Sequence, residues 1–250
     1  MEGRKIMAAT YDNLQAVAAR IRRAARAAGR DPGEVRLLAV TKTFSAAAIE
    51  DALACGLRSF GENYVQEAVE KMDALARSPG LDRLEWHLIG PLQSNKTRIA
   101  AQRFDWVQTL DRAKIARRLS EARPADAPPL NVLIQVDVSG EASKSGVPPA
   151  EVAALAREVA TLPRLRLRGL MTVPEPNADA RAQCLPFHAV RELYDSLRNS
   201  GLPLDTLSMG MSEDLEAAIA EGATMVRVGT AIFGTRANGT RETRKMKEAA

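Results

Sequence analysis

The sequence predicts an α/β protein, a single-domain (β/α)8 TIM-type barrel with an extra helix at its N-terminus. Eight short apolar or β-branched segments alternate with helical patterns between residues 35 and 228. Strands separated by helices pair in parallel, because each crossover returns the chain in the same direction. The 250 residues are a usual length for eight such units, which favours a closed barrel over an open doubly wound sheet.

The elements follow from the period of the apolar residues. The leading helix is predicted at residues 10–29, where one face carries Leu14, Val17, Ala18 and Ile21. Short β-branched or apolar runs predict strands at residues 35–41, 57–60, 84–89, 106–110, 131–138, 167–173, 204–208 and 225–228. Helical periodicity predicts helices at residues 45–54, 64–76, 94–102, 112–122, 149–161, 178–199 and 213–221.

One domain accounts for the whole chain, residues 1–250. The barrel is expected over residues 35–234, and a polar tail over residues 237–250. The segment closest in composition to a linker, RPADAPP at residues 123–129, is short enough to be a loop between a helix and a strand.

Composition and charge indicate a cytoplasmic protein. The net charge of +4 is small and spread along the chain, so we expect no nucleic-acid partner. Cys55 and Cys184 have no disulfide or metal-ligand spacing, and we expect no metal. No segment has the roughly 20 apolar residues of a membrane span, and the first ten residues lack a signal-peptide core.

Lys42 is the first candidate for chemistry, because it directly follows the first predicted strand. Active groups of such barrels collect at the carboxyl ends of the strands. The strand ends in Thr41-Lys42-Thr43, which lacks the glycines of a dinucleotide-binding turn. Lys42 is either a solvent-facing lysine or a partly desolvated amine able to attack an aldehyde.

The loops after the seventh and eighth strands indicate a phosphate site. Barrels of this kind often bind phosphate there, with help from a helix N-terminus. Ser208, Gly210 and Ser212 follow the seventh strand, and Gly229-Thr230 follows the eighth. Each motif is weak by itself, because Gly and Ser also cap helices. A phosphate site near a strand-end lysine is a more specific combination.

Arg227 lies in the apolar eighth strand, two residues before Gly229. A buried arginine keeps its charge and must be paired or hydrogen-bonded. It is either a structural ion pair with an acid near the bottom of the barrel or a group that points at the ring of a bound cofactor.

With these residues assembled, the chain resembles the pyridoxal phosphate homeostasis protein family, single-domain proteins whose barrel is like the N-terminal domain of alanine racemase. The resemblance covers residues 35–234. The matching stretches are LLAVTKT (37–43), FGENYVQEA (60–68), WHLIGPLQSNK (86–96), VDVSGEASKSG (136–146), RGLMTV (168–173), LSMGMSEDLEAAI (207–219) and VRVGTAIFG (226–234).

The resemblance implies that pyridoxal 5′-phosphate (PLP) is the cofactor and that Lys42 holds it as a Schiff base. It also implies that Ser208, Gly229 and Thr230 bind the phosphate, with Met211 and Ser212 close by. Asn63 would line the pocket, and Arg227 would meet the pyridine nitrogen. An arginine there keeps this nitrogen unprotonated, which weakens PLP as an electron sink.

The expected function is therefore intracellular PLP homeostasis: buffering the cofactor or delivering it to PLP-dependent apoenzymes, with little or no catalysis, by a protein expected to be a monomer. The alternative is a PLP-dependent amino-acid racemase of low activity that uses Lys42 as one base. A second base is hard to find among the three tyrosines. Tyr11 and Tyr194 fall on predicted helices, and the apolar setting of Tyr64 favours packing. His87 is expected in the core and His188 on a helix.

Two further lysines, Lys96 and Lys144, fall in strand-end loops and could react with free PLP. Lys144 is the better candidate for a secondary site. Nucleic-acid binding by the basic N-terminal helix is the third hypothesis and predicts a salt-dependent affinity.

Overall fold

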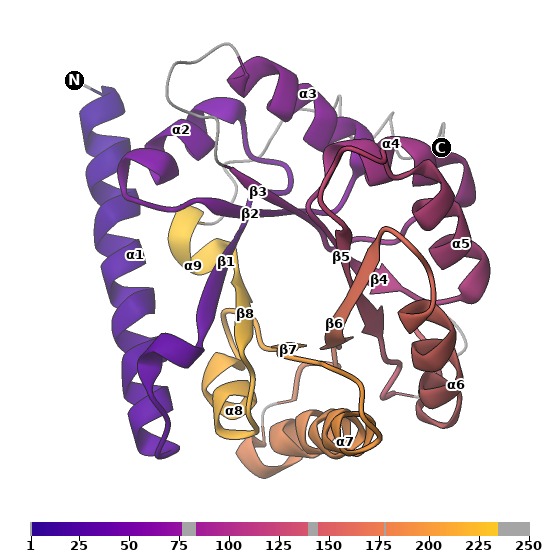
Figure 1. Ribbon diagram of the computed structural model, residues 1–250. Coiled ribbons are helices and arrows are strands. Elements are labelled where there is room, and N and C mark those ends of the chain that lie inside the picture. The colour runs from indigo at the N-terminus through magenta and orange to yellow at the C-terminus, as the bar shows by residue number, and fades with distance from the viewer. Residues whose placement is uncertain (1, 77–83, 140–144, 178, 235–250) are drawn as a thin grey trace.

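Eight parallel strands close into a barrel, in the order β1 to β8, in the computed structural model (Figure 1). The structure describes residues 2–76, 84–139, 145–177 and 179–234. The strands are β1 (Arg36–Val40), β2 (Ser59–Glu62), β3 (Glu85–Leu88), β4 (Trp106–Leu110), β5 (Leu130–Gln135), β6 (Leu165–Met171), β7 (Thr206–Ser208) and β8 (Met225–Val228). The prediction of a (β/α)8 barrel is confirmed. Lys144 and the predicted tail at residues 237–250 lie outside the described residues.

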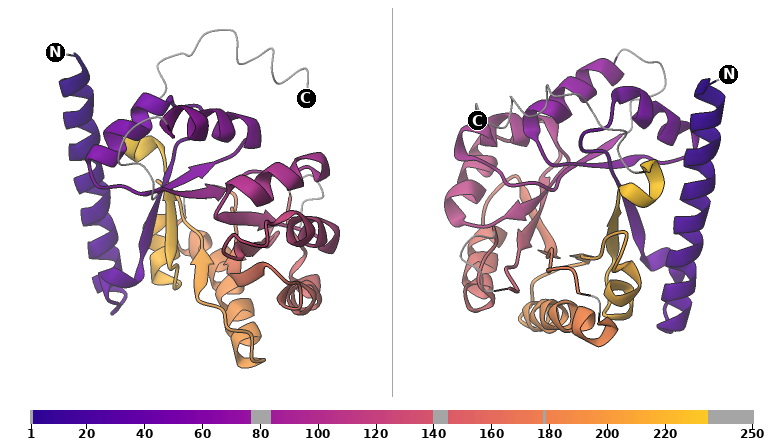
Figure 2. Two further views of the ribbon diagram at one scale, coloured as in Figure 1. Left: turned by 45° about the horizontal axis from the view of Figure 1, so that its top comes forward. Right: turned by 180° about the vertical axis from the view of Figure 1, so that it is seen from behind.

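Helices cover the outer face of the barrel, as the views in Figure 2 show. They are α1 (Glu2–Ala27), α2 (Ala46–Ala54), α3 (Val65–Leu75), α4 (Thr97–Arg103), α5 (Ala113–Ala122), α6 (Pro149–Ala160), α7 (Ala180–Asn199), α8 (Leu215–Ala220) and α9 (Thr230–Phe233). Short 3-10 turns occupy Pro32–Glu34 and Ser94–Lys96. The first helix begins earlier than the predicted residue 10.

Strand alternation divides the barrel into two buried regions. Side chains on the outer face, such as Ala39, Phe60 and Val107, join the helices in one large apolar core. A smaller apolar cluster of Trp106, Leu133 and Met171 forms a separate group. This division matters for function, because the polar residues of the candidate site belong to the barrel interior and its carboxyl rim.

The N-terminal helix completes the ring of helices. The helix that follows β8, α9, has only four residues, and α1 packs against α2, α8 and α9 (Figures 1 and 2). Polar bonds tie it in place: Asn13 Nδ2 donates to the Ile232 carbonyl at 3.0 Å, and Arg20 pairs with Glu216 at 2.7 Å. The predicted extra helix therefore covers the region where the first and last strands meet.

The packing of the apolar face of α1 against the barrel should contribute to the free energy of unfolding. Ile21 is 5% exposed within the main core. Replacing it with alanine should lower the free energy of unfolding by about 2–5 kcal/mol, because the lost contacts leave a cavity. Chemical denaturation followed by far-UV circular dichroism measures this.

Arg22→Ala is the matched control on the same helix, because Arg22 is exposed. It should change the free energy of unfolding by no more than about 0.5 kcal/mol. Equal effects of the two substitutions would contradict the docked position of α1.

Candidate functional site

The predicted site residues gather at the carboxyl ends of four neighbouring strands. Lys42 follows β1, and Asn63 follows β2. Met211 and Ser212 follow β7, and Gly229-Thr230 follows β8. These strands are consecutive in the barrel, because β7 pairs with β8, β8 with β1, and β1 with β2. Closure of the barrel thus brings together residues from both ends of the chain.

Lys42 lies on a turn directly beyond β1 and is partly buried. The strand before it is in close contact with the end of β8: a Cβ atom added at Gly229 would lie 3.1 Å from the Val40 carbonyl oxygen. A larger residue at Gly229 would push the two strand ends apart. Glycine therefore keeps the loop after β8 next to the turn that carries Lys42.

Asn63 is partly buried where β2 ends. The chain after β3 passes directly over its backbone, since a Cβ at Gly90 would lie 2.2 Å from the Asn63 carbonyl oxygen. Only glycine fits there. The Gly90 carbonyl in turn accepts a hydrogen bond of 2.8 Å from the Thr109 hydroxyl. These contacts hold Asn63 at the rim.

Arg227 is a buried cation, 4% exposed, inside the upper part of the barrel. Its Nη1 donates to Ser208 Oγ and its Nη2 to the Thr172 carbonyl oxygen, both at 2.8 Å. Burial lowers the pKa of Arg227 to about 10, opposed by the charge of Asp214, so the side chain stays protonated at neutral pH. Both hydrogen-bond partners are neutral, so Arg227 is held by neutral groups and not by the structural ion pair that was its alternative role. Two of its five N–H groups make these bonds, which leaves donors for a ligand.

Ser208 lies between Arg227 and Gln108 inside the barrel. It is fully buried, accepts the bond from Arg227 and donates its hydroxyl hydrogen to Gln108 Oε1 at 2.6 Å. A hydroxyl has one hydrogen to donate, and Gln108 takes it. The side chain thereby fixes the orientation of Arg227. That Ser208 helps to bind a phosphate stays a prediction.

Gln108 continues this chain of hydrogen bonds to His87. Its Nε2 lies 2.9 Å from His87 Nδ1, and the His87 ring stacks on Trp106 with centroids 5.1 Å apart. Since the amide donates, His87 Nδ1 accepts and the ring hydrogen is on Nε2. Burial lowers the pKa of His87, which keeps the imidazole neutral. The expectation of a core histidine is confirmed, and Gln108 was missed by the sequence reasoning.

The remaining predicted residues lie in the loop after β7 and at the start of α9. Met211 and Ser212 are partly buried, and Thr230 is exposed at the start of α9. The Met211 N–H donates to Asp214 Oδ1, so this amide already has a partner. Arg20 of α1 donates to the Ser212 carbonyl oxygen at 2.9 Å, which fixes this loop from outside.

The residues considered as a second base are spread over the barrel. Tyr11 lies on α1 and is half exposed, and Tyr194 lies buried on α7. Tyr64 precedes α3 beside Asn63 and is 49% exposed. The expectation that Tyr64 packs in an apolar setting is therefore wrong, because its ring lies at the surface.

A buried group of charges behind β1 and β2 also escaped prediction. Lys71 and Glu62 are buried, and both are bonded to Thr41, the residue before Lys42. A signal for it exists in the sequence: Lys71 falls on the face of α3 that also carries Ala68, Met72 and Leu75. A lysine on an apolar helix face requires an internal partner.

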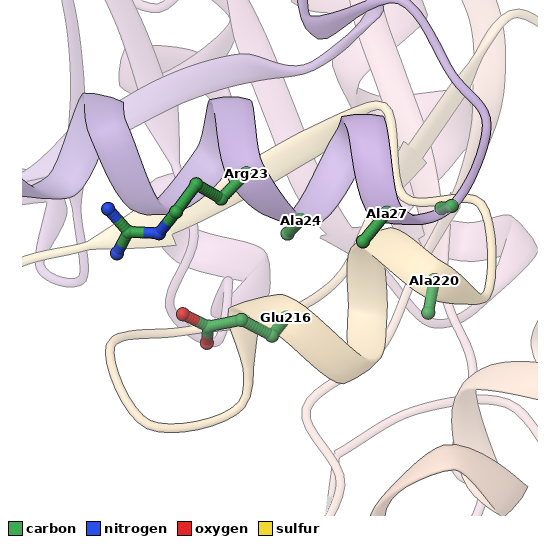
Figure 3. Close-up of a pocket in the computed structure, with 6 residues that line it drawn as sticks. Arg23, Ala24, Ala27, Glu216 and Ala220 are labelled. Carbon is green, nitrogen blue, oxygen red and sulfur yellow. The ribbon is translucent and has the colours of Figure 1, made fainter.

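A groove of about 340 Å³ lies elsewhere, on the outside between α1 and α8 (Figure 3). Its lining is mostly small: Arg23, Ala24, Ala27, Ala28, Glu216 and Ala220. None of these residues belongs to the strand-end site, so the groove has no part in it.

Possible metal ligands do not cluster in the described part of the chain. It holds no group of three or more His, Cys, Asp or Glu side chains that could bind a metal ion. Within the same residues, no helix is long and apolar enough to cross a bilayer.

Burial of neutral His87 predicts that stability falls in acid. Because its pKa is lowered on folding, the unfolded chain binds more protons below the ordinary histidine pKa of about 6.5. The free energy of unfolding should therefore decrease as the pH falls from about 7 to about 5. His87→Gln should reduce the slope of this decrease, as measured by denaturant titration at each pH.

His188→Gln is the control for this slope. His188 is on the surface of α7, and its hydrogen bond to Glu221 raises its pKa, which acts in the opposite direction. The variant should keep or steepen the decrease. A slope unchanged by His87→Gln would contradict a buried neutral imidazole.

Comparison with known proteins shows the family of the chain. The model of the alanine racemase N-terminal domain family matches residues 13–237. The pyridoxal phosphate homeostasis protein of Pseudomonas aeruginosa is 60% identical over 233 residues, 93% of this chain and 98% of the relative. The protein of that name from Escherichia coli K12 is 53% identical over 227 residues, 90% of this chain and 95% of the relative.

Solved structures agree with the fold. PipY of Synechococcus elongatus, solved with PLP bound, has a TM-score of 0.79 and 36% identity, covering 90% of this chain and 100% of PipY. Alanine racemase of Corynebacterium glutamicum has a TM-score of 0.64 at 22% identity and covers 91% of this chain and 64% of the racemase. The racemase likeness concerns the barrel alone.

Proposed function

Because the chain belongs to the family of pyridoxal phosphate homeostasis proteins, with the barrel of the alanine racemase N-terminal domain, we propose that it binds PLP through a Schiff base on Lys42. The observation that carries the proposal is the β1–β8 pair, which places the turn of Lys42 and the loop at Gly229 next to each other and Arg227 on the strand between them. Each group suits one part of PLP. The amine can react with the aldehyde, the fixed cation can contact the ring nitrogen, and the glycine loop leaves room for the phosphate.

The phosphate is assigned to the loops after β7 and β8. Ser212, Gly229 and Thr230 supply a hydroxyl, a close backbone and the first residue of a helix. These groups are partly buried or exposed, unlike Ser208, so they can reach a ligand. Met211 and Asn63 line the same rim.

Arg227 is assigned to the pyridine nitrogen. Its guanidinium is already oriented by Ser208 and Thr172, and it keeps its charge at neutral pH. A group that is always protonated donates to the ring nitrogen and leaves it without a proton. PLP supplies an electron sink for amino-acid chemistry, and this pairing makes it a weak one.

The weak electron sink favours holding PLP over transforming amino acids. We therefore assign the protein to PLP homeostasis, as a buffer or a donor of PLP to apoenzymes, acting as a monomer in the cytoplasm. The two cysteines, Cys55 and Cys184, are free thiols, as expected in a reducing compartment. The barrel shared with alanine racemase supports the second candidate, a racemase of low activity.

The anchor can be tested by absorption spectroscopy of the purified protein with PLP, before and after borohydride reduction. The wild type should show a band near the visible edge that reduction abolishes, with the label on Lys42 in peptide mapping. Lys42→Ala should lack the reducible band, because its amine is gone.

Lys114→Ala serves as the matched control, since Lys114 is exposed on α5. It should keep the band and the labelled peptide. A colourless wild type would overturn the proposed cofactor, whereas a coloured Lys42→Ala would move the anchor to another lysine, with Lys144 mapped first.

Carrier and racemase are separated by turnover. With PLP bound, L-alanine should be converted to D-alanine far more slowly than the roughly one per second at the low end of ordinary enzymes. Chiral chromatography of timed samples measures this. Interconversion at ordinary enzyme rates that Lys42→Ala abolishes would establish the racemase instead.

A further inference from the structure

A group of charged side chains on the helix side of the barrel wall bonds to the turn that carries Lys42. We call it the Lys71 cluster; it consists of Lys71, Glu62 and Glu67 with Thr41 and Thr43. Lys71 Nζ, on α3, donates to the Thr41 carbonyl, to Glu62 Oε1 and to Glu67 Oε1, each at 2.7 Å. An ammonium has three N–H donors, and all three are used. Lys71 is therefore committed to this cluster.

The cluster forms hydrogen bonds with the backbone of the residues before and after Lys42. Before it, Thr41 offers its carbonyl to Lys71, and its hydroxyl donates to Glu62 Oε1 at 2.7 Å. After it, the Thr43 N–H donates to Glu67 Oε1 at 2.5 Å. One lysine and two glutamates thus fix the residues before and after the proposed anchor.

The backbone of Thr43 has an unusual conformation that these hydrogen bonds stabilise. Its φ of 66° lies in the left-handed region, which β-branched residues rarely adopt. The bond to Glu67 satisfies its N–H in that conformation. Such strained residues persist where their surroundings determine them, and they concentrate at functional sites.

Burial makes this cluster a poor device for stability alone. The side chain of Lys71 is 8% exposed and that of Glu62 is fully buried. Glu62 Oε2 has no hydrogen-bond partner among the described residues. The free-energy cost of removing these charges from water offsets much of their mutual attraction. Apolar residues of similar size often stabilise a fold as well as a buried ion pair does. The arrangement is better explained by the turn it shapes.

We propose that Lys71, Glu62 and Glu67 are positioning residues for Lys42: they hold the turn at residues 41–43 in the one backbone conformation that presents the Lys42 amine to the PLP aldehyde. This inference rests on the proposed function. The three residues act through the backbone on either side of Lys42. Their loss should slow the capture of PLP and weaken its retention while the barrel stays folded.

The test is Lys71→Met, which keeps an unbranched apolar side chain, one atom shorter, and removes the three hydrogen bonds. After removal of bound cofactor, the protein is mixed with PLP, and both the rate of appearance of the reducible Lys42 band and the dissociation constant are measured. Loss of the fixed turn should slow capture and weaken binding by about tenfold or more.

Arg123→Met is the matched control. Arg123 is 6% exposed and, like Lys71, donates to backbone carbonyl oxygens, those of Ala101, Phe104 and Pro128, on the β4–β5 side of the barrel. It should lower the melting temperature as Lys71→Met does. Its rate of PLP capture and its dissociation constant should match those of the wild type.

Glu67 supplies a second pair of variants on a more exposed position, which keeps the test valid if Lys71→Met does not fold. Glu67→Ala removes the acceptor of the Thr43 N–H and should slow PLP capture. Glu67→Gln keeps an oxygen at that place, so it should restore most of the rate. A merely structural role would not separate these two variants by capture rate.

The outcomes distinguish the two proposals. If the wild type forms no reducible band on Lys42, the proposed function fails first. If the wild type forms it, but the Lys71 and Glu67 variants capture PLP at the wild-type rate, the positioning role alone is overturned. A decrease in rate that Arg123→Met reproduces at equal loss of stability would overturn it as well.

Discussion

The pairing of β1 with β8 is the contact on which the rest of this molecule depends. It aligns Leu38 with Arg227 and Ala39 with Val228, so that residues near the two ends of the chain become neighbours. Parallel strands expose their carboxyl ends at one edge, and closure makes that edge a ring. The turn that carries Lys42 and the loop at Gly229 lie beside one another only because of this ladder. Helix α1 covers the same region from outside, which makes it part of the barrel wall.

The interior of the barrel is organised around a cation that cannot be neutralised there. Arg227 is satisfied by Ser208 and the Thr172 carbonyl, and Ser208 passes the chain of hydrogen bonds to Gln108 and then to neutral His87. Each member fixes the hydrogen position of the next. A charge held by neutral dipoles in this way keeps its direction without a hydrogen bond to a carboxylate, which suits contact with a neutral ring nitrogen.

Polar groups on the two faces of the barrel wall have different roles. Inside, the chain from Arg227 to His87 shapes the floor of the proposed site. Outside, the Lys71 cluster shapes the turn that carries the amine. Both depend on strand alternation, since Leu38 faces inward beside Arg227, while Thr41 and Glu62 lie on the helix side. The candidate site thus depends on two separate groups of hydrogen bonds, one on each face of the barrel wall.

The sequence by itself determined the fold class, the order of the elements and the rim positions of Lys42, Asn63 and Gly229. These depend on local periodicity and on the rule that strand ends carry the active groups, and both can be read from a single chain. Only the tertiary structure decided that the Ser208 hydroxyl serves Gln108 and Arg227, that Tyr64 is exposed, and that Lys71 bonds to the turn before Lys42. The reason is physical: hydrogen-bond partners and exposure arise from contacts between segments far apart in the chain, and these exist only after the barrel has closed.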